Sequence, residues 1–305
     1  MLTQEQIDFY RTNGYLGLEG ILSHQEVEDL RRVTDAFVER SRQVTKTDDV
    51  FDLEPGHTPE SPRLRRLINP SQQHDVYARG LRHDRILDIT AQLIGPGIRT
   101  NGDKLNMKSA EVGSPVEWHQ DWAFYPQTND DLLAVGVAID DMTRENGCLL
   151  VIPGSHQGRI YDHHLNGAFA GAVTEPDFTG EGAVPIEVKA GGISIHHVRT
   201  LHGSAPNTSG KPRRLLLYMY CAVDAWPLVQ SATSWEEFNS KILRGEPTRE
   251  PRLVDVPVRI PLPPAERPGS IYEIQTVLES SKMTPGDVGT ASEISSVLSG
   301  EDKVA

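Results

Sequence analysis

A histidine and an aspartate separated by one residue stand in the segment 118–122, which reads Trp-His-Gln-Asp-Trp. The segment has the pattern of a strand, in which residues two apart project to the same face. His119 and Asp121 are therefore expected to point together. An imidazole and a carboxylate are two of the three ligands in the arrangement that holds iron(II) and leaves positions open. Taken alone, the triplet is weak evidence, because a surface or hydrogen-bonded pair has the same pattern.

The stretch 191–204 carries three further histidines, His196, His197 and His202. His202 is the expected third ligand, because it lies at the end of a strand beside Gly203, where the missing side chain permits a close backbone approach. His196 and His197 compete for that role. An ordinary core or supporting position is the better interpretation of each of them.

Arg213 follows His202 by eleven residues, at the start of the next expected strand. A turn through 207–210 would return it beside the same cavity. There a guanidinium can pair bidentately with the distal carboxylate of a dicarboxylic cosubstrate whose other end chelates the metal. Ser204 shares the face of His202 and can add a hydroxyl donor to that carboxylate. The pattern therefore favours a metal centre with a cation beside it.

Asn106 and Lys108 share one face of the strand expected over 98–108. We expect both side chains to line the cosubstrate or substrate pocket.

Helices and short strands must position these residues. Capping boxes at Thr3 with Gln6 and at Ser23 with Glu26 predict two helices, and a third is expected over 84–94. From residue 98 onward, short apolar or alternating runs indicate an antiparallel sandwich or barrel. The strands are expected at 98–108, 115–122, 132–140, 147–152, 185–188, 192–198 and 213–223. The aperiodic stretch 154–182 is long enough to be a lid over the mouth of the site.

Several motifs, in this order and spacing, resemble the phytanoyl-CoA dioxygenase family over about residues 3–225. They are Trp118–Asp121, Phe124–Pro126, Asn146–Leu149, Ile152–His156, and His202–Ser204 with Asn207 and Arg213. The opening, from Thr3 through Asn13-Gly14-Tyr15 to Leu22-Ser23, also fits. Joint agreement of several motifs is far more specific than the His-x-Asp triplet.

The resemblance implies a mostly β fold with flanking helices, a double-stranded β-helix of the jelly-roll, cupin-like type. One oxygenase domain would fill 1–305: helical support over 1–97, the β-helix over 98–225 with its lid, and a C-terminal extension over 226–305 with a flexible end. It also implies iron(II) held by His119, Asp121 and His202. The cosubstrates would be O2 and 2-oxoglutarate, the latter anchored by Arg213 with help from Ser204.

The substrate is expected to be a small, largely apolar molecule that is hydroxylated at an unactivated carbon. Val135, Gly136 and Val137 stand where related acyl-CoA hydroxylases tend to carry a large aromatic residue, which predicts more room near the metal. An acyl-CoA hydroxylase remains the alternative. A cupin-like enzyme or a binding module using another divalent metal is a more distant one. The cupin-like enzyme would not need Arg213, and the intact set of His119, Asp121, His202 and Arg213 counts against a binding module that has lost activity.

The net charge of −13 disfavours nucleic acid and anionic membranes as partners, because both attract clustered basic residues. Two cysteines, Cys148 and Cys221, are too few for a disulfide framework. No leader or membrane segment stands out, so we expect a cytoplasmic protein with free thiols, working as a monomer or homodimer.

Overall fold

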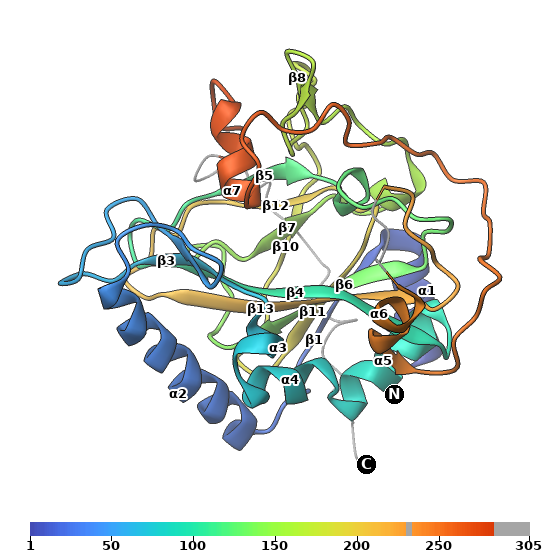
Figure 1. Cartoon of the computed structure of the whole chain (residues 1–305), viewed down its shortest axis with the longest axis horizontal. Helices are drawn as coiled ribbons and strands as arrows, with labels where there is room; N and C mark the ends of the chain where they lie inside the picture. The colour runs from blue at the N-terminus through green and yellow to red at the C-terminus, as the bar shows by residue number, and fades with distance from the viewer. Residues whose placement is uncertain (230–233, 284–305) are drawn as a thin grey trace.

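Two antiparallel sheets stacked face to face form the body of the molecule (Figure 1) in the computed structural model, which describes residues 1–229 and 234–283. The larger sheet has the order β1 (Tyr15–Leu18), β11 (Ile193–His197), β6 (Leu132–Ala138), β13 (Arg213–Ala222), β4 (Ile98–Lys108), β3 (Leu64–Ile68), β2 (Phe51–Leu53), with β14 (Ile242–Arg244) also paired to β4. The smaller sheet has the order β10 (Val184–Ile186), β7 (Leu149–Val151), β12 (His202–Ser204), β5 (Val116–His119). This arrangement confirms the predicted jelly-roll fold, as two open sheets.

Helices cover the outer face of the larger sheet (Figure 1). Along the chain the α-helices are α1 (Gln4–Asn13), α2 (His24–Arg40), α3 (Pro70–Gln73), α4 (Asp75–Leu81), α5 (Asp84–Ile94), α6 (Trp235–Ser240) and α7 (Ile271–Ile274). Short 3-10 turns are η1 (Ser41–Gln43), η2 (Asp121–Ala123), η3 (Ser155–Gln157) and η4 (Gln275–Val277). Both predicted capping boxes are formed, at Thr3 and at Ser23.

The two largest apolar clusters of the described residues follow from this layering. The first lies between the helices and the larger sheet, where α2 and α5 bury one face against β4, β6, β11 and β13. The second contains apolar side chains of both sheets, such as Leu150 of β7 and Leu217 of β13. Because the apolar residues of a half-buried strand alternate with others, the larger sheet contributes to both cores and stands as a fixed floor beneath the site.

The N-terminal third is only partly helical. β1 pairs with β11 and forms one edge of the larger sheet, and β3 pairs with β4, so this region extends the larger sheet on both sides. Tyr15–Leu18 is buried at every position, which leaves no alternation to mark it as a strand. Its pairing partner lies far away in sequence, and long-range contacts of this kind override local propensity.

Two late segments cover the smaller sheet. The insertion 154–182 carries the hairpin of β8 (His164–Leu165) and β9 (Ala168–Phe169), and the C-terminal chain passes beside it (Figure 1). The amide of Phe169 donates to the carbonyl of Pro263 (3.0 Å), which joins the two segments. The flexible end predicted for 226–305 falls mainly on residues outside the described ranges. Within those ranges, no helix is both long and apolar enough to cross a membrane.

Candidate metal centre and its cavity

His119 and His202 face each other across two neighbouring strands. β5 pairs with β12 so that His202 lies directly opposite His119, and their ring centroids are 4.0 Å apart. Gly203 permits this close pairing, because a Cβ there would lie 2.9 Å from the carbonyl oxygen of Val116. Both histidines are buried, so the pair is fixed by backbone register rather than by flexible side chains.

Asp121 completes the cluster from a turn, not from a strand. β5 ends at His119, and Asp121 begins η2. Gln120 between them keeps extended dihedral angles (φ −119°, ψ 123°), so side chains 119 and 121 still project to one side. The amide of Trp122 donates to the carbonyl of Val198 (2.9 Å), which holds the turn. The expectation of a strand through 122 is therefore wrong, although the shared direction is right.

The three residues present ligand atoms that all lie within 4.8 Å of one another. The Nδ1 atom of His119 lies 2.8 Å from the Glu117 carbonyl oxygen, and that of His202 lies 2.9 Å from the Thr200 carbonyl oxygen. A carbonyl only accepts, so each Nδ1 carries the proton and each Nε2 keeps its lone pair for a metal.

Burial keeps both rings neutral. It lowers the pKa of His119 to about 4, and it lowers the pKa of His202 well below the usual histidine range. Two neutral imidazoles and one carboxylate fit a first-row divalent metal such as iron(II), with positions left open for other ligands.

Two side chains flank Asp121 inside the fold. Nε2 of His196 lies 3.4 Å from Oδ2 of Asp121, and its ring centroid is 4.2 Å from that of His202. Tyr125 is the second neighbour: burial raises the pKa of its phenol well above the usual value, and the charge of Asp121 raises this pKa further. His196 therefore holds the supporting position expected for it and is absent from the three-residue ligand cluster.

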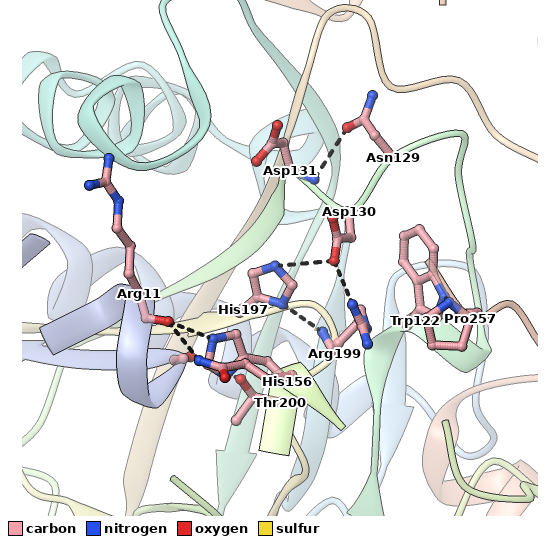
Figure 2. A network of polar contacts seen from close by, with 12 residues as sticks. Arg11, Trp122, Asn129, Asp130, Asp131, His156, His197, Arg199, Thr200 and Pro257 are labelled. Atoms are coloured by element: carbon pink, nitrogen blue, oxygen red, sulfur yellow. Dashed lines mark hydrogen bonds and ion pairs between the residues drawn. The ribbon is translucent and has the colours of Figure 1, made fainter. Parts of the chain in front are cut away.

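His197, the next residue of β11, points the other way. Its Nε2 is 3.8 Å from a carboxylate oxygen of Asp130, which pairs with Arg199 at 2.9 Å (Figure 2). In the same view, His156 bonds to the backbone carbonyl of Arg11 (3.1 Å). Neither His197 nor His156 faces the metal cluster. This network stabilises the loop between His197 and His202 on the side that faces away from the candidate metal ligands.

A narrow cavity opens between the two sheets beside the candidate ligands His119, Asp121 and His202. Its walls are Lys104, Asn106, Val116, His119, Asp121, Ala134, Leu149, His196, His202, Gly203, Ser204, Arg213, Leu215, Leu217, Met219 and Ile271. The predicted residues Asn106, Ser204 and Arg213 are all among them. Among the described residues, Nε of Arg213 and Oδ1 of Asn106 are buried without a hydrogen-bond partner. Orphaned polar atoms in a cavity indicate that a polar ligand belongs there.

Lys108 does not line this cavity. Its fully buried amine donates to the carbonyls of Ser114, Ser204 and Ala205, so its role is to hold the loop before β5 and the end of β12 together. Alternation along β4 places Lys104 on the same face, and it is Lys104 whose side chain reaches the cavity. The sequence pattern identified the correct face but assigned the wrong lysine to the cavity.

The absence of an aromatic residue in β6 does not create room near the metal. A Cβ added to Gly136 would lie 2.6 Å from Oγ of Ser194 and 2.8 Å from a methyl carbon of Leu215. Val135 and Val137 pack into the core on the helical side of the sheet. The space predicted there is filled by neighbouring side chains.

Two aromatic rings cover the site, Phe124 at the end of η2 and Phe169 in the insertion. Phe124 meets the ring of His119 edge-on at 5.7 Å, and Phe169 of β9 meets Phe124 at 4.9 Å. The C-terminal segment adds Ile271 to the cavity wall. The insertion and the C-terminal chain together shield the metal cluster from water.

Comparisons with known proteins agree with this geometry. A family model described as phytanoyl-CoA dioxygenase matches residues 10–215. A probable alpha-ketoglutarate-dependent hypophosphite dioxygenase from Stutzerimonas stutzeri is 35% identical over 285 residues, covering 90% of this chain and 97% of that protein. An L-proline trans-4-hydroxylase from Streptomyces griseoviridis is 30% identical, covering 72% and 86% respectively. Among solved structures, the non-heme alpha-ketoglutarate-dependent carbocyclase SnoK from nogalamycin biosynthesis has a TM-score of 0.60 and 25% identity, covering 81% of this chain and 93% of that one.

Proposed function

The chain belongs to the phytanoyl-CoA dioxygenase family and is an Fe(II)- and 2-oxoglutarate-dependent dioxygenase, and from that premise we propose that it oxidises a small molecule, with hypophosphite as the first candidate. One observation carries the proposal: the buried residues His119, Asp121 and His202 line the same narrow cavity as the buried cation Arg213.

Each polar residue of the cavity has a part in this proposal. His119, Asp121 and His202 would hold iron(II), and Arg213 with Ser204 would hold the distal carboxylate of 2-oxoglutarate. When bound, iron and 2-oxoglutarate supply an oxidant from O2, one oxygen atom entering succinate as carbon dioxide leaves and the other entering the substrate. The chain itself orients the reactants and excludes water through Phe124 and Phe169.

The substrate proposal rests on a relative and on the cavity, and it replaces the largely apolar molecule, oxidised at an unactivated carbon, that was expected from the sequence. The 35% identical protein from Stutzerimonas stutzeri spans nearly the whole chain and is named for hypophosphite. The cavity is narrow and roofed by aromatic rings, which disfavours a bulky thioester. Its apolar wall, with Leu215 and Leu217, suits the methylene groups of 2-oxoglutarate. Oxidation of hypophosphite would convert one P–H bond into P–OH and give phosphite.

The test is turnover with purified enzyme, iron(II), ascorbate and 2-oxoglutarate. Succinate formation is compared for hypophosphite, L-proline and a branched acyl-CoA, and phosphorus NMR follows phosphite. We expect hypophosphite to raise succinate formation at least about tenfold above the substrate-free rate, with one phosphite per succinate. Coupled turnover with the acyl-CoA instead would replace this proposal by the acyl-CoA alternative.

We also infer a reducing compartment and a monomeric or homodimeric enzyme. Cys148 and Cys221 are both buried free thiols, which supports the first inference. Light scattering and localisation of a tagged chain would check each one separately.

A further inference from the structure

Lys104 places a second cation in the metal cavity. It stands on β4 two residues before Asn106, and both side chains line the cavity together with His119 and Asp121. The backbone of Lys104 is paired on both sides, with Leu217 of β13 and with Ile68 of β3. The ammonium group therefore points from the larger sheet into the cavity that the candidate metal ligands line.

The ammonium group of Lys104 has no partner in the part of the chain that the structure describes. Within residues 1–229 and 234–283, no carboxylate oxygen lies within 4.0 Å of it and no hydrogen bond satisfies it. The other cations nearby are engaged: Lys108 donates to three carbonyls, and Arg66 lies 3.9 Å from Asp52. Burial lowers the pKa of Lys104, and the charge of Asp121 acts against that lowering. A half-buried cation without a partner indicates a missing anion.

The formal charges in the cavity favour one class of anion. 2-Oxoglutarate brings two negative charges, one of which belongs with Arg213, and Asp121 brings one more. Iron(II), Arg213 and Lys104 together bring four positive charges, one more than these three negative charges. In a cavity of low dielectric constant, a small monoanion would neutralise that excess, whereas a neutral substrate would leave it.

We propose that Lys104 is the residue that binds the substrate, and that the substrate class of this enzyme is a small monoanion held beside the metal by the Lys104 ammonium group. Hypophosphite belongs to that class. The inference rests on the proposed iron and 2-oxoglutarate site, and it adds the recognition element that this site otherwise lacks. Lys104 thus contacts the substrate. Asn106, two residues further along β4 on the same face, then contacts 2-oxoglutarate.

Lys104→Met and Lys104→Arg test the proposal, with Lys189→Met as a matched control. Methionine keeps the length of the side chain and removes the charge, and arginine keeps the charge. Lys189 is exposed and pairs with Asp141 far from the cavity, so its loss removes an equal charge from the surface. All four proteins are loaded anaerobically with iron(II) and titrated first with 2-oxoglutarate and then with hypophosphite, while the visible charge-transfer band is followed.

The expected result is separation of the two ligands. Lys104→Met should bind 2-oxoglutarate within about threefold of wild type but bind hypophosphite at least about tenfold more weakly, as loss of a charge-assisted contact predicts. Lys104→Arg should retain part of the hypophosphite affinity, and Lys189→Met all of it. Formate and nitrite should compete with hypophosphite in wild type and lose that competition in Lys104→Met.

Three outcomes would overturn the inference. Equal hypophosphite affinity in wild type and Lys104→Met would show that the lysine does not bind the anion. A loss of 2-oxoglutarate affinity instead would make Lys104 a cosubstrate anchor. A wild-type band that none of the three anions perturbs would exclude a monoanion substrate while leaving the iron and 2-oxoglutarate site intact. If wild type formed no band at all, the proposed function itself would fail.

Discussion

His196 shows how a residue outside the ligand set can determine the metal site. Its Nε2 approaches Oδ2 of Asp121 at 3.4 Å, while its Nδ1 is buried and has no partner within residues 1–229 and 234–283. A carboxylate held at one oxygen by a neighbour keeps the other oxygen free and oriented for the metal. The histidine thus positions Asp121 without touching the reacting atoms.

His196→Leu should therefore weaken iron(II) binding about 10- to 100-fold, as loss of a hydrogen bond to a ligand typically does. Anaerobic calorimetry with iron(II), or with cobalt(II) as a stable substitute, measures the affinity. His197→Leu is the matched control, because it lies on the same strand and faces Asp130; it should lower stability but leave metal affinity within about threefold. Equal metal affinity in wild type and His196→Leu would remove His196 from the site.

At this scale, motif spacing predicted His119, Asp121, His202, Ser204 and Arg213 as one group, and all five lie around one cavity. The same reasoning mistook the lysine. Alternation identifies the face of a strand, but it does not say where along that face the cavity begins. That boundary depends on which carbonyls approach from other strands, and here they capture the amine of Lys108.

Among the elements, β12 is closely constrained at Gly203. Gly203 has two close neighbours. An added Cβ would lie 2.0 Å from a methyl carbon of Met283, which can move, and 2.9 Å from the backbone oxygen of Val116 in the neighbouring strand, which cannot move freely. Any widening of the β5–β12 pair separates His119 from His202.

Gly203→Ala should lower the free energy of unfolding by about 1–3 kcal/mol, as overpacking does, and also weaken metal binding. Gly210→Ala is the matched control, because an added Cβ there meets nothing within 4 Å. Chemical denaturation and metal titration of both variants check the two effects. A Gly203→Ala protein as stable and as metal-competent as the control would contradict the role given to this close approach.

The elements that the sequence predicted best are the long or well-capped ones. β4 has the predicted bounds, and the capped helices begin where Thr3 and Ser23 place them. β1 and β12 were not predicted as strands in their own right. Each is short and buried throughout, and its stability comes from partners distant in sequence, which no local pattern encodes.

For the whole molecule, buried neutral histidines couple folding to pH. Burial lowers the pKa of His119 and of His163 to about 4, and that of His197 to about 3. In the unfolded chain these side chains take up protons near pH 6.5. The unfolded state therefore binds more protons below pH 6.5, and the stability that these groups confer above that pH is lost as the pH falls.

Metal-free enzyme should accordingly melt at least about 5 °C lower at pH 5.5 than at pH 7.5. Differential scanning calorimetry with a chelator present checks this. His24→Gln, which removes an exposed histidine at the start of α2, should leave the pH dependence unchanged. A melting temperature that stayed constant over this range would contradict the neutral buried state of the three histidines.

Only part of the whole molecule's architecture could be predicted from the sequence. The two-sheet architecture followed from the alternating runs and the motif order. The cover of the site did not, because Ile271 and Pro263 reach it from a segment that lies beyond the matched family region of 10–215. A Pro-rich, charged segment carries no periodic signal, so its contacts over the insertion emerge only from the folded chain.

The central claim is that His119, Asp121 and His202 hold iron(II) while Arg213 anchors 2-oxoglutarate in the same cavity. Anaerobic titration of the iron(II)-loaded protein with 2-oxoglutarate tests it most directly, in wild type, Arg213→Ala and Asp121→Ala. We expect a visible charge-transfer band in wild type, at least about a tenfold weaker 2-oxoglutarate affinity in Arg213→Ala, and no band in Asp121→Ala. Absence of the band in wild type, or equal affinity in wild type and Arg213→Ala, would contradict it.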